Sequence, residues 1–291
     1  MKWWCRYARM RTDDSSDSPH VQFVGCAARR ETGAVTDVSL QPTPARFRAL
    51  ARSSPWRWSS IQFEWKDRGA ASADHVWIRR PDRFRVEGPD GSVRDARVST
   101  RAFEGSFYRE GSKGKWLPTP GMWPSETEPA LDSEGFVVDR PRRSDIDFDA
   151  PFYTDYHWVA MLDPVELADR GLGGTDDQTP PVELTGLRAV THHGRAAWEA
   201  TATPTPNYDP RCSCCSLLAG EPTDDQERWV SESSSTIRLD VETAVCVFIE
   251  HLEDPPRVNL DIKIIDVDGH YDDSLFPERR SRWSRLLWPR R

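Results

Sequence analysis

The chain has 291 residues and a mass of 33.3 kDa, which allows one large β domain or two ordinary domains. Its apolar runs are short, whereas a helix that spans a membrane needs roughly 20 apolar residues, so the sequence excludes a helical membrane protein. The formal net charge of −8 excludes the broadly basic surface of a generic nucleic-acid-binding protein. Arginine outnumbers lysine 34 to 5, which is typical of a GC-rich bacterial genome.

The N-terminal segment, residues 1–40, shows no hydrophobic periodicity and contains the polar stretch TDDSSDSPH. We therefore predict that this segment is disordered. The first residues, MKWWCRYARM, are basic but have neither an apolar core of roughly 7–15 residues nor a small-residue cleavage site, so they do not form a secretory signal. We expect a cytoplasmic protein with reduced thiols. A mis-assigned start codon is the alternative, and it would favour a location in the cell envelope.

A short helix and a series of strands are predicted in the first half of the chain. Phe47 and Leu50 stand three residues apart between prolines in PTPARFRALARSSP, which favours an amphipathic helix over residues 42–55. After this helix, apolar residues alternate with polar ones, as in half-buried strands. The clearest case is HVWIRRPDRFRVEG, in which residues 75–79 and 83–87 should pair antiparallel around a Pro-Asp turn, with their apolar side chains on one face.

The second half of the chain contains one further helix candidate and several strand-like runs. The segment YHWVAMLDPVELADRG has near-helical spacing, and Pro164 suits the first position of a second short helix. Two later hairpins turn at His193-Gly194 and at residues 240–243, and VNLDIKIIDVDG forms the last long strand. About nine strands joined by short turns predict a mainly β, α+β fold. We expect a curved, half-open antiparallel β-barrel meander whose apolar concave face is covered by two or three short helices.

These elements follow one another in a recognisable order after the first helix: WSSIQFEWKDRG, HVWIRRPDRFRVEGPDG, a helical segment, HHGRAAWEATA and IRLDVETAVCVFIEH. The order resembles the LolA-like superfamily of lipoprotein-carrier proteins, including actinobacterial lipid-binding lipoproteins, over roughly residues 40–277. The resemblance implies a strongly curved half-barrel whose concave face is plugged by helices, and which binds acyl chains between sheet and helices. The family's D-x-x-T-G turn reads Asp240-Val241-Glu242-Thr243-Ala244 here, so alanine takes the place of glycine.

On this resemblance, residues 41–277 form a single LolA-like β domain with a cysteine-rich insertion near residues 207–230, followed by a basic tail over residues 278–291. We predict that six large apolar residues line its core or a ligand cavity: Trp65, Val76, Ile78, Phe84, Val86 and Trp198. A fully packed barrel without a cavity is the alternative. The predicted ligand is a hydrophobic small molecule or an acyl chain.

The most unusual local feature is Cys212-Ser-Cys214-Cys215, three thiols within four residues. Thiolates are preferred ligands of zinc and Cu(I), and Cys246 and His192 on neighbouring predicted strands could complete such a site. The second ligand pair of the usual zinc motifs is missing from the sequence. Free thiols that stabilise the insertion by packing are therefore the favoured interpretation, ahead of a metal. A disulfide between the insertion and Cys246 is a further alternative.

Other motifs are better explained by structure than by chemistry. Aspartates alternate over residues 145–149 as in a calcium loop, but Ala150 and Tyr156 stand where such a loop needs Gly and Glu. His157 lies among aromatic residues, which indicates a buried, hydrogen-bonded histidine, with a ligand-facing role as the alternative.

The C-terminal tail from Arg279 to Arg291 places Trp and Leu on one helical face and arginines on the others. This pattern suits either a solvated tail, a docking segment or a peripheral contact with an anionic membrane.

The sequence contains no G-x-S-x-G, H-E-x-x-H or P-loop pattern. We therefore expect a non-catalytic protein that binds a lipid or another hydrophobic ligand between sheet and helices, with no cofactor unless the cysteines bind zinc. The alternatives are a thiol- or metal-binding protein that uses the Cys212–Cys215 cluster, or a membrane-surface interaction protein that uses its arginine-rich tail. No nucleic-acid partner is expected.

Overall fold

The computed structural model describes residues 41–98, 105–108, 116–119, 121–143, 145–169, 179–224, 229–231 and 233–276. The predictions for the N-terminal segment, residues 1–40, and for the basic tail, residues 278–291, lie outside these residues. Within the described part of the chain, no helix has both the length and the apolar character needed to cross a membrane.

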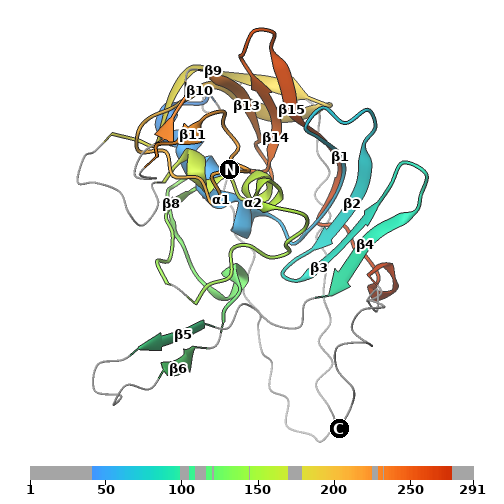
Figure 1. The fold of residues 1–291 in the computed structure, drawn as a ribbon. Coiled ribbons are helices and arrows are strands. Elements are labelled where there is room, and N and C mark those ends of the chain that lie inside the picture. The colour runs from blue at the N-terminus through green and yellow to red at the C-terminus, as the bar shows by residue number, and fades with distance from the viewer. Residues whose placement is uncertain are drawn as a thin grey trace, which may run out of the picture. The chain divides into compact units, whose positions relative to one another are not determined.

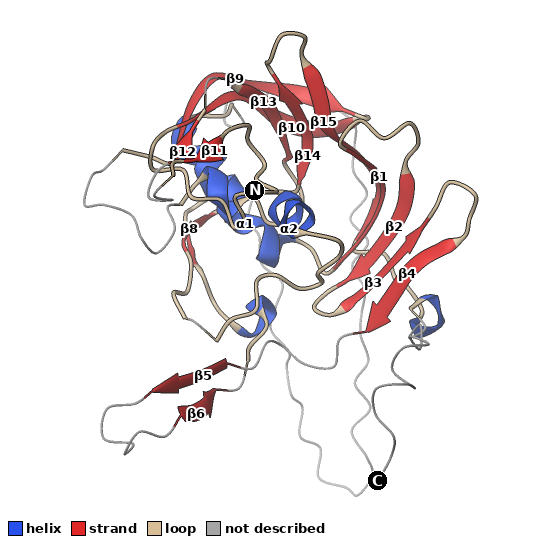
Figure 2. Ribbon diagram, viewed as in Figure 1, coloured by secondary structure: helices blue, strands red, loops and turns tan. Residues whose placement is uncertain are grey.

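Nine antiparallel strands form one large sheet in the order β4-β3-β2-β1-β15-β14-β13-β10-β9 (Figure 1). The strands are β1 (Ser60–Asp67), β2 (Asp74–Arg79), β3 (Arg83–Glu87), β4 (Val93–Val98), β9 (Val182–His192), β10 (Arg195–Pro204), β13 (Ser235–Asp240), β14 (Cys246–His251) and β15 (Arg257–Val267). The edge strands β4 and β9 do not pair with each other, so the sheet curves without closing into a barrel (Figure 2). This confirms the predicted mainly β, half-open antiparallel architecture.

Two α-helices and several short elements complete the described fold. They are α1 (Pro44–Arg57), α2 (Tyr156–Leu162), the 3₁₀ turns η2 (Pro124–Glu126), η3 (Val165–Leu167) and η4 (Asp273–Leu275), and the two-stranded pairs β5 (Gly105–Tyr108) with β6 (Trp116–Thr119), β7 (Ala130–Leu131) with β8 (Val137–Asp139), and β11 (Glu221–Pro222) with β12 (Trp229–Val230). Both α-helices lie on the inner side of the curved sheet (Figure 2).

The large sheet joins two meanders at its centre. β1 to β4 follow one another along the chain, and so do the sheet's strands from β9 to β15. The junction is the pairing of β1 with β15, in which Phe63 lies opposite Ile264 and Trp65 opposite Ile262. All four side chains are buried. Apolar cross-strand contacts therefore hold together the first and last long strands, which lie far apart in the sequence.

The β2–β3 hairpin has the predicted register. Val76 lies opposite Val86 and Ile78 opposite Phe84, and these four side chains are all buried. The residues between them along each strand are less buried, as the period of two in a strand requires. The antiparallel pairing around the Pro-Asp turn, with the apolar residues on one face, is therefore confirmed.

The two later hairpins also turn where the sequence predicts. His193 and Gly194 have φ angles of 46° and 84°, which suit a type I′ turn between β9 and β10. Between β13 and β14, Asp240 Oδ1 accepts hydrogen bonds from the backbone and the hydroxyl of Thr243, and Ala244 has a φ of 60°. This left-handed conformation favours glycine, so Ala244 adopts a backbone conformation that is unusual for alanine.

Side chains define where the two helices begin. The Thr43 side chain accepts a hydrogen bond from Arg46 N at 3.3 Å at the start of α1, and the Asp155 carboxylate accepts one from His157 N at 3.0 Å at the start of α2. The second short helix predicted at Pro164 is only the 3₁₀ turn η3, and Pro164 precedes that turn instead of opening it.

The helices and the sheet enclose one hydrophobic core. Its largest fully buried side chains include Trp158 of α2, Trp198 of β10, Phe47 of α1 and Phe63 of β1. Trp158 Nε1 donates a hydrogen bond to Pro151 O at 2.9 Å, which satisfies the polar atom of a buried ring. Large side chains from both layers therefore pack together beneath α1 and α2.

Candidate functional site

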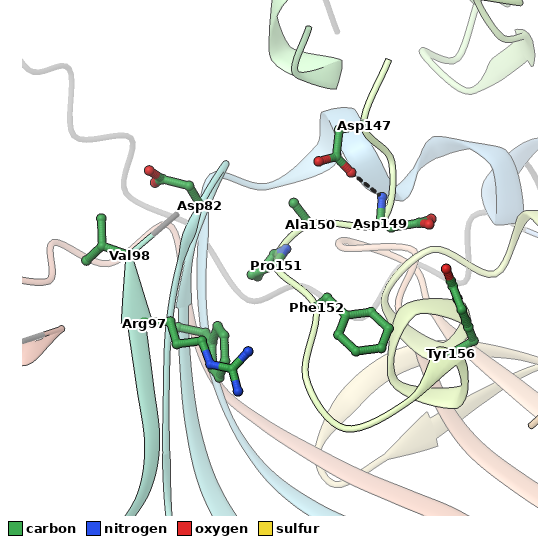
Figure 3. A pocket seen from close by; sticks show the side chains of 10 residues that line it. Asp82, Arg97, Val98, Asp147, Asp149, Ala150, Pro151, Phe152 and Tyr156 are labelled. Carbon is green, nitrogen blue, oxygen red and sulfur yellow. Dashed lines mark hydrogen bonds between the residues drawn. The ribbon is translucent and has the colours of Figure 1, made fainter. Parts of the chain in front are cut away.

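A groove opens between β3 and β4 on one side and the loop of residues 147–152, which leads to α2, on the other (Figure 3). Its volume is about 640 Å³. The residues that line it are Asp82, Phe84, Arg97, Val98, Asp147, Asp149, Ala150, Pro151, Phe152 and Tyr156. Because β4 is an edge strand, the groove lies at an open margin of the sheet, where regular strand and irregular loop face each other.

An aromatic surface lines this groove. The rings of Phe152 and Tyr156 meet edge to face with their centroids 5.4 Å apart, and Phe152 is 40% exposed. Phe84 contributes from β3, and its ring centroid lies 5.5 Å from that of Tyr153 and 6.4 Å from that of Trp158. The aromatic contacts thus continue from the groove into the core. Such rings give a ligand a large apolar surface to cover.

Charged side chains surround the aromatic surface. Asp147 accepts a hydrogen bond from Asp149 N at 3.0 Å (Figure 3). Burial raises the pKa of Asp149, and the Arg211 guanidinium, which is hydrogen-bonded to its carboxylate, opposes that rise. On the strand side, the Arg97 guanidinium lies 5.8 Å from the ring centroid of Phe84. A groove lined by both apolar and charged side chains suits an amphipathic ligand.

The six residues predicted to line the core or a cavity all belong to the hydrophobic core, with at most 8% of each exposed. Of these six, Phe84 also lines the groove. Trp65 belongs to the aromatic layer behind it, with its ring centroid 5.3 Å from that of Trp158. Trp198 packs against Phe136 instead, with the centroids of the two rings 5.6 Å apart. The structure therefore brings only part of this set close to the groove.

The loop side of the groove was not found by sequence reasoning. No ligand-binding role is predicted for Phe152 or Tyr156, because Phe152 belongs to no clear apolar period and Tyr156 only opens a predicted helix. The signal that could have indicated them is the dense aromatic run PFYTDYHW next to a predicted helix. Aromatic residues in a loop are good candidates for a surface that contacts a ligand.

The three clustered cysteines form a second group of interest. Their sulfur atoms all lie within 4.8 Å of one another, with Cys212 Sγ 2.9 Å from Cys214 Sγ and Cys214 Sγ 3.7 Å from Cys215 Sγ. Hydrogen bonds from Cys214 and then Cys215 lower the pKa of Cys212. Burial raises the pKa of Cys215 to about 12. The most exposed of the three thiols belongs to Cys214.

Cys246 and His192 do not join this thiol group among the described residues. Cys246 is fully buried in β14, where burial raises its pKa, and its sulfur lies 3.8 Å from Phe248 O. His192 Nε2 is hydrogen-bonded to Ile262 O at 3.0 Å. The structure therefore separates the residues that the sequence analysis grouped as possible zinc ligands.

His192, His193 and Asp261 form a separate group whose candidate ligand atoms lie within 4.8 Å of one another. Hydrogen bonds from His192 and His193 lower the pKa of Asp261 to about 2. Arg238 Nη1 lies 3.2 Å from His192 Nδ1, so a cation already stands beside the group. The arrangement is explained by the hairpin turn and its hydrogen bonds, in agreement with the turn predicted at His193-Gly194.

His157 is buried, as the sequence predicts, and its Nδ1 lies 3.3 Å from Ser216 O. Burial lowers its pKa to about 4. Its Nε2 stands 3.7 Å from Asp67 Oδ1, and neither of these two atoms has a hydrogen-bond partner among the described residues. Burial raises the pKa of Asp67 to about 6. Burial thus favours the neutral form of both groups, which face each other across 3.7 Å.

No protein-family model matches the chain, and no curated protein matches its sequence. Among solved structures, the crystal structure of MucB is 14% identical with a TM-score of 0.38, and the match covers 81% of this chain and 63% of that one. The MucA/MucB complex of Pseudomonas aeruginosa gives 16% identity, a TM-score of 0.34, and 80% and 60% coverage. LprF from Mycobacterium bovis gives 13% identity, a TM-score of 0.31, and 82% and 98% coverage. The chain thus spans less than two thirds of MucB, and these similarities are too low to assign it to a family.

Proposed function

We propose that this protein is a non-catalytic binding protein whose groove holds the hydrophobic part of a lipid or a similar amphipathic molecule. The observation that carries the proposal is the groove of about 640 Å³ lined by Phe84, Phe152 and Tyr156. Sites for small molecules typically have volumes of roughly 300–1,000 Å³ and mostly apolar walls with a few polar groups. The resemblance to LolA-like carriers supports an acyl chain as the apolar part of the ligand.

The proposed site lies at the margin of the sheet and not at its centre. The space beneath α1 and α2 is occupied by large side chains such as Trp158 and Trp198. A ligand that enters the groove instead contacts the partly exposed ring of Phe152, with Asp82, Arg97, Asp147 and Asp149 also in the groove lining. This placement allows an apolar chain to be covered while its polar end stays in water.

The groove's carboxylates do not indicate proton transfer. Burial raises the pKa of two of them, Asp149 and Asp82. The Asp149 carboxylate is hydrogen-bonded to the Arg211 guanidinium. The Asp82 carboxylate lies 3.8 Å from the Arg83 guanidinium. Both carboxylates are neutralised by cations of this chain, which suits a structural role at the rim of a binding site.

A chain-length series tests this proposal. We expect alkyl glucosides, used below their micelle concentrations, to bind with an affinity that rises about fourfold per added methylene, because each buried methylene contributes about 0.8 kcal/mol. Isothermal titration calorimetry measures this slope. The variant Phe152→Ser should bind the longest ligand more weakly than the wild-type protein. The control variant Ile265→Ser changes an exposed apolar residue on β15, away from the groove lining, and should bind this ligand as the wild-type protein does. Affinity that is independent of chain length, or equal losses in both variants, would contradict the proposal.

Two further expectations remain predictions. A contact of the tail from Arg279 to Arg291 with an anionic membrane concerns residues outside the described part of the chain. The location of the protein, cytoplasmic or in the cell envelope, is likewise proposed from the sequence. Vesicle sedimentation with and without anionic lipid, using the full chain and a variant with these arginines replaced by glutamine, tests the first of them.

A further inference from the structure

The thiol loop, which we define as residues 208–218, is attached at both ends to one buried carboxylate. Glu166 of η3 accepts a hydrogen bond from the Tyr208 hydroxyl near the start of the loop and one from Leu217 N at 3.0 Å near its end. Arg211 N lies 3.4 Å from the same carboxylate. Leu218 N in turn donates to the Tyr208 hydroxyl at 3.3 Å. The loop's geometry is therefore set by contacts that do not involve the cysteines.

The middle of the loop is attached through Arg211. Its guanidinium is hydrogen-bonded to Asp163, which directly follows α2, and to Asp149 in the wall of the groove. Asp163 is buried, and although burial alone would raise its pKa, Arg140 and Arg211 hold that pKa below its ordinary value. These contacts hold the backbone on either side of the cysteines against the domain, so the thiols are brought together by a supported loop and not by a free one.

We propose that Cys212, Cys214 and Cys215 form a binding site for Cu(I). Their three sulfur atoms lie within 4.8 Å of one another. Three sulfur ligands placed about 2.3 Å from a metal in a trigonal plane stand about 4.0 Å apart. The observed separations of 2.9 Å and 3.7 Å are close enough to this arrangement for side-chain rotation to complete it.

The contacts among the thiols also suit a thiophilic cation. Cys214 Sγ lies within hydrogen-bonding distance of both Cys212 Sγ and Cys215 Sγ, so a cation can replace these sulfur–sulfur contacts. Cu(I) takes the place of the protons that the sulfurs share, and each displaced proton passes to solvent while a copper–sulfur bond forms. The metal reaches the site through Cys214, which is exposed, and is then shielded by Cys215, which is buried.

The number of ligands favours Cu(I) over zinc. Structural zinc sites have four protein ligands in a tetrahedron. Among the described residues, no fourth cysteine, histidine or carboxylate belongs to this group. Cu(I) is a softer cation for which thiolates are preferred ligands, and three of them satisfy it.

Copper titration of the full chain tests the assignment. The reduced protein is titrated anaerobically with Cu(I) in competition with bathocuproine disulfonate, and copper is counted after gel filtration. We expect the wild-type protein to retain about one copper per chain, the ratio that a single three-thiol site allows. The variant Cys212→Ser/Cys214→Ser/Cys215→Ser should lose it. Copper X-ray absorption should show sulfur neighbours only, at about the 2.3 Å of metal–thiolate bonds.

The chain offers matched controls. Cys5→Ser/Cys26→Ser and Cys246→Ala each remove thiols that the proposed site does not use, and they should leave copper retention unchanged. Circular dichroism of every variant verifies the fold, so loss of copper can be separated from unfolding. The proposal is wrong if the triple variant retains copper, if the wild-type protein retains none, or if it binds zinc in preference to Cu(I). An isolated protein in which Cys212 and Cys214 form a stable disulfide under reducing conditions would also overturn it.

Discussion

The first meander and a pair of loop-rich segments, residues 145–169 and 208–218, are stabilised in opposite ways. In β1 to β3, buried apolar side chains alternate with more exposed ones, and the strands hold together by backbone pairing and apolar contact. The two loop-rich segments contribute no strand to the large sheet. Buried carboxylates hold them: Asp163 is bonded to two arginines, and Glu166 is bonded to Tyr208 and to backbone amides. The groove lies where these regions meet. A binding surface here combines a rigid strand wall with a loop wall that depends on ion pairs.

The largest loss in the free energy of unfolding is expected when the buried carboxylate of Asp163 is removed. Replacing Asp163→Ala leaves the Arg140 and Arg211 guanidinia without the carboxylate that both contact. Breaking such a buried pair costs about 3–5 kcal/mol, because a charge stays buried without compensation. Urea denaturation measures the change in the free energy of unfolding.

The control for this prediction is Asp139→Ala, since Asp139 lies 3.9 Å from Arg142 in a pair with both side chains exposed. Exposed pairs contribute about 0–1 kcal/mol. Equal losses of unfolding free energy in the two variants would show that the buried ion pairs of Asp163 stabilise the fold no more than an exposed pair does.

A smaller loss is expected from a single apolar deletion in the first meander. Ile78 is fully buried opposite Phe84, so Ile78→Ala should lower the free energy of unfolding by about 3 kcal/mol through lost burial and the cavity it leaves. Ile265→Ala, on an exposed position of β15, should change it by less than about 0.5 kcal/mol. If Ile78→Ala left the free energy of unfolding unchanged, the buried apolar face would not be what stabilises the hairpin.

Two buried groups, Asp67 and His157, make the free energy of unfolding depend on pH in opposite directions. Asp67 has a pKa of about 6, raised by burial, so the folded state binds this proton more tightly than the unfolded state, and stability falls as pH rises from about 4 to 6. His157 has a pKa of about 4, lowered by burial, so stability falls as pH drops from about 6.5 to 4. The two effects oppose each other across the same pH range.

Asp67→Asn removes one side of this balance. The variant should be about 1 kcal/mol more stable at pH 7, a value reduced for the partial exposure of Asp67, and should match the wild-type protein below about pH 4. Its stability should also fall more steeply on acidification, because the histidine effect is no longer opposed. Thermal melts at several pH values measure this difference, and parallel curves would refute it.

The smallest effect is expected at the β13–β14 turn. Ala244→Gly relieves a left-handed alanine, which costs about 1–2 kcal/mol, but removes a buried methyl group worth about 0.8 kcal/mol and adds the backbone entropy of glycine, about 0.5–1 kcal/mol. These contributions nearly cancel, so we expect a change below about 1 kcal/mol by chemical denaturation. A larger stabilisation would indicate that the methyl group contributes little to the core.

The sequence predicted the parts of the fold whose signals are local. Alternation placed Val76, Ile78, Phe84 and Val86 on one buried face, and His193-Gly194 marked a hairpin turn. The same reasoning could not find the groove, because the closeness of Phe152 to β4 arises from tertiary packing between segments far apart in the chain. It also could not show that Arg211 connects Asp163 with Asp149. Contacts of this kind depend on where irregular chain runs, and no period in the sequence records that.

Photo-crosslinking shows directly where the apolar chain of a bound ligand lies. A long-chain alkyl glucoside that carries a diazirine near the end of its chain is bound to the full-length protein, activated by light and located by peptide mass spectrometry. We expect label on the peptides that contain Phe152 and Tyr156 and on the β3–β4 peptide that contains Phe84. Label concentrated on the peptides of α1 and of Trp198, with none on the groove, would place the ligand beneath the helices and contradict the account.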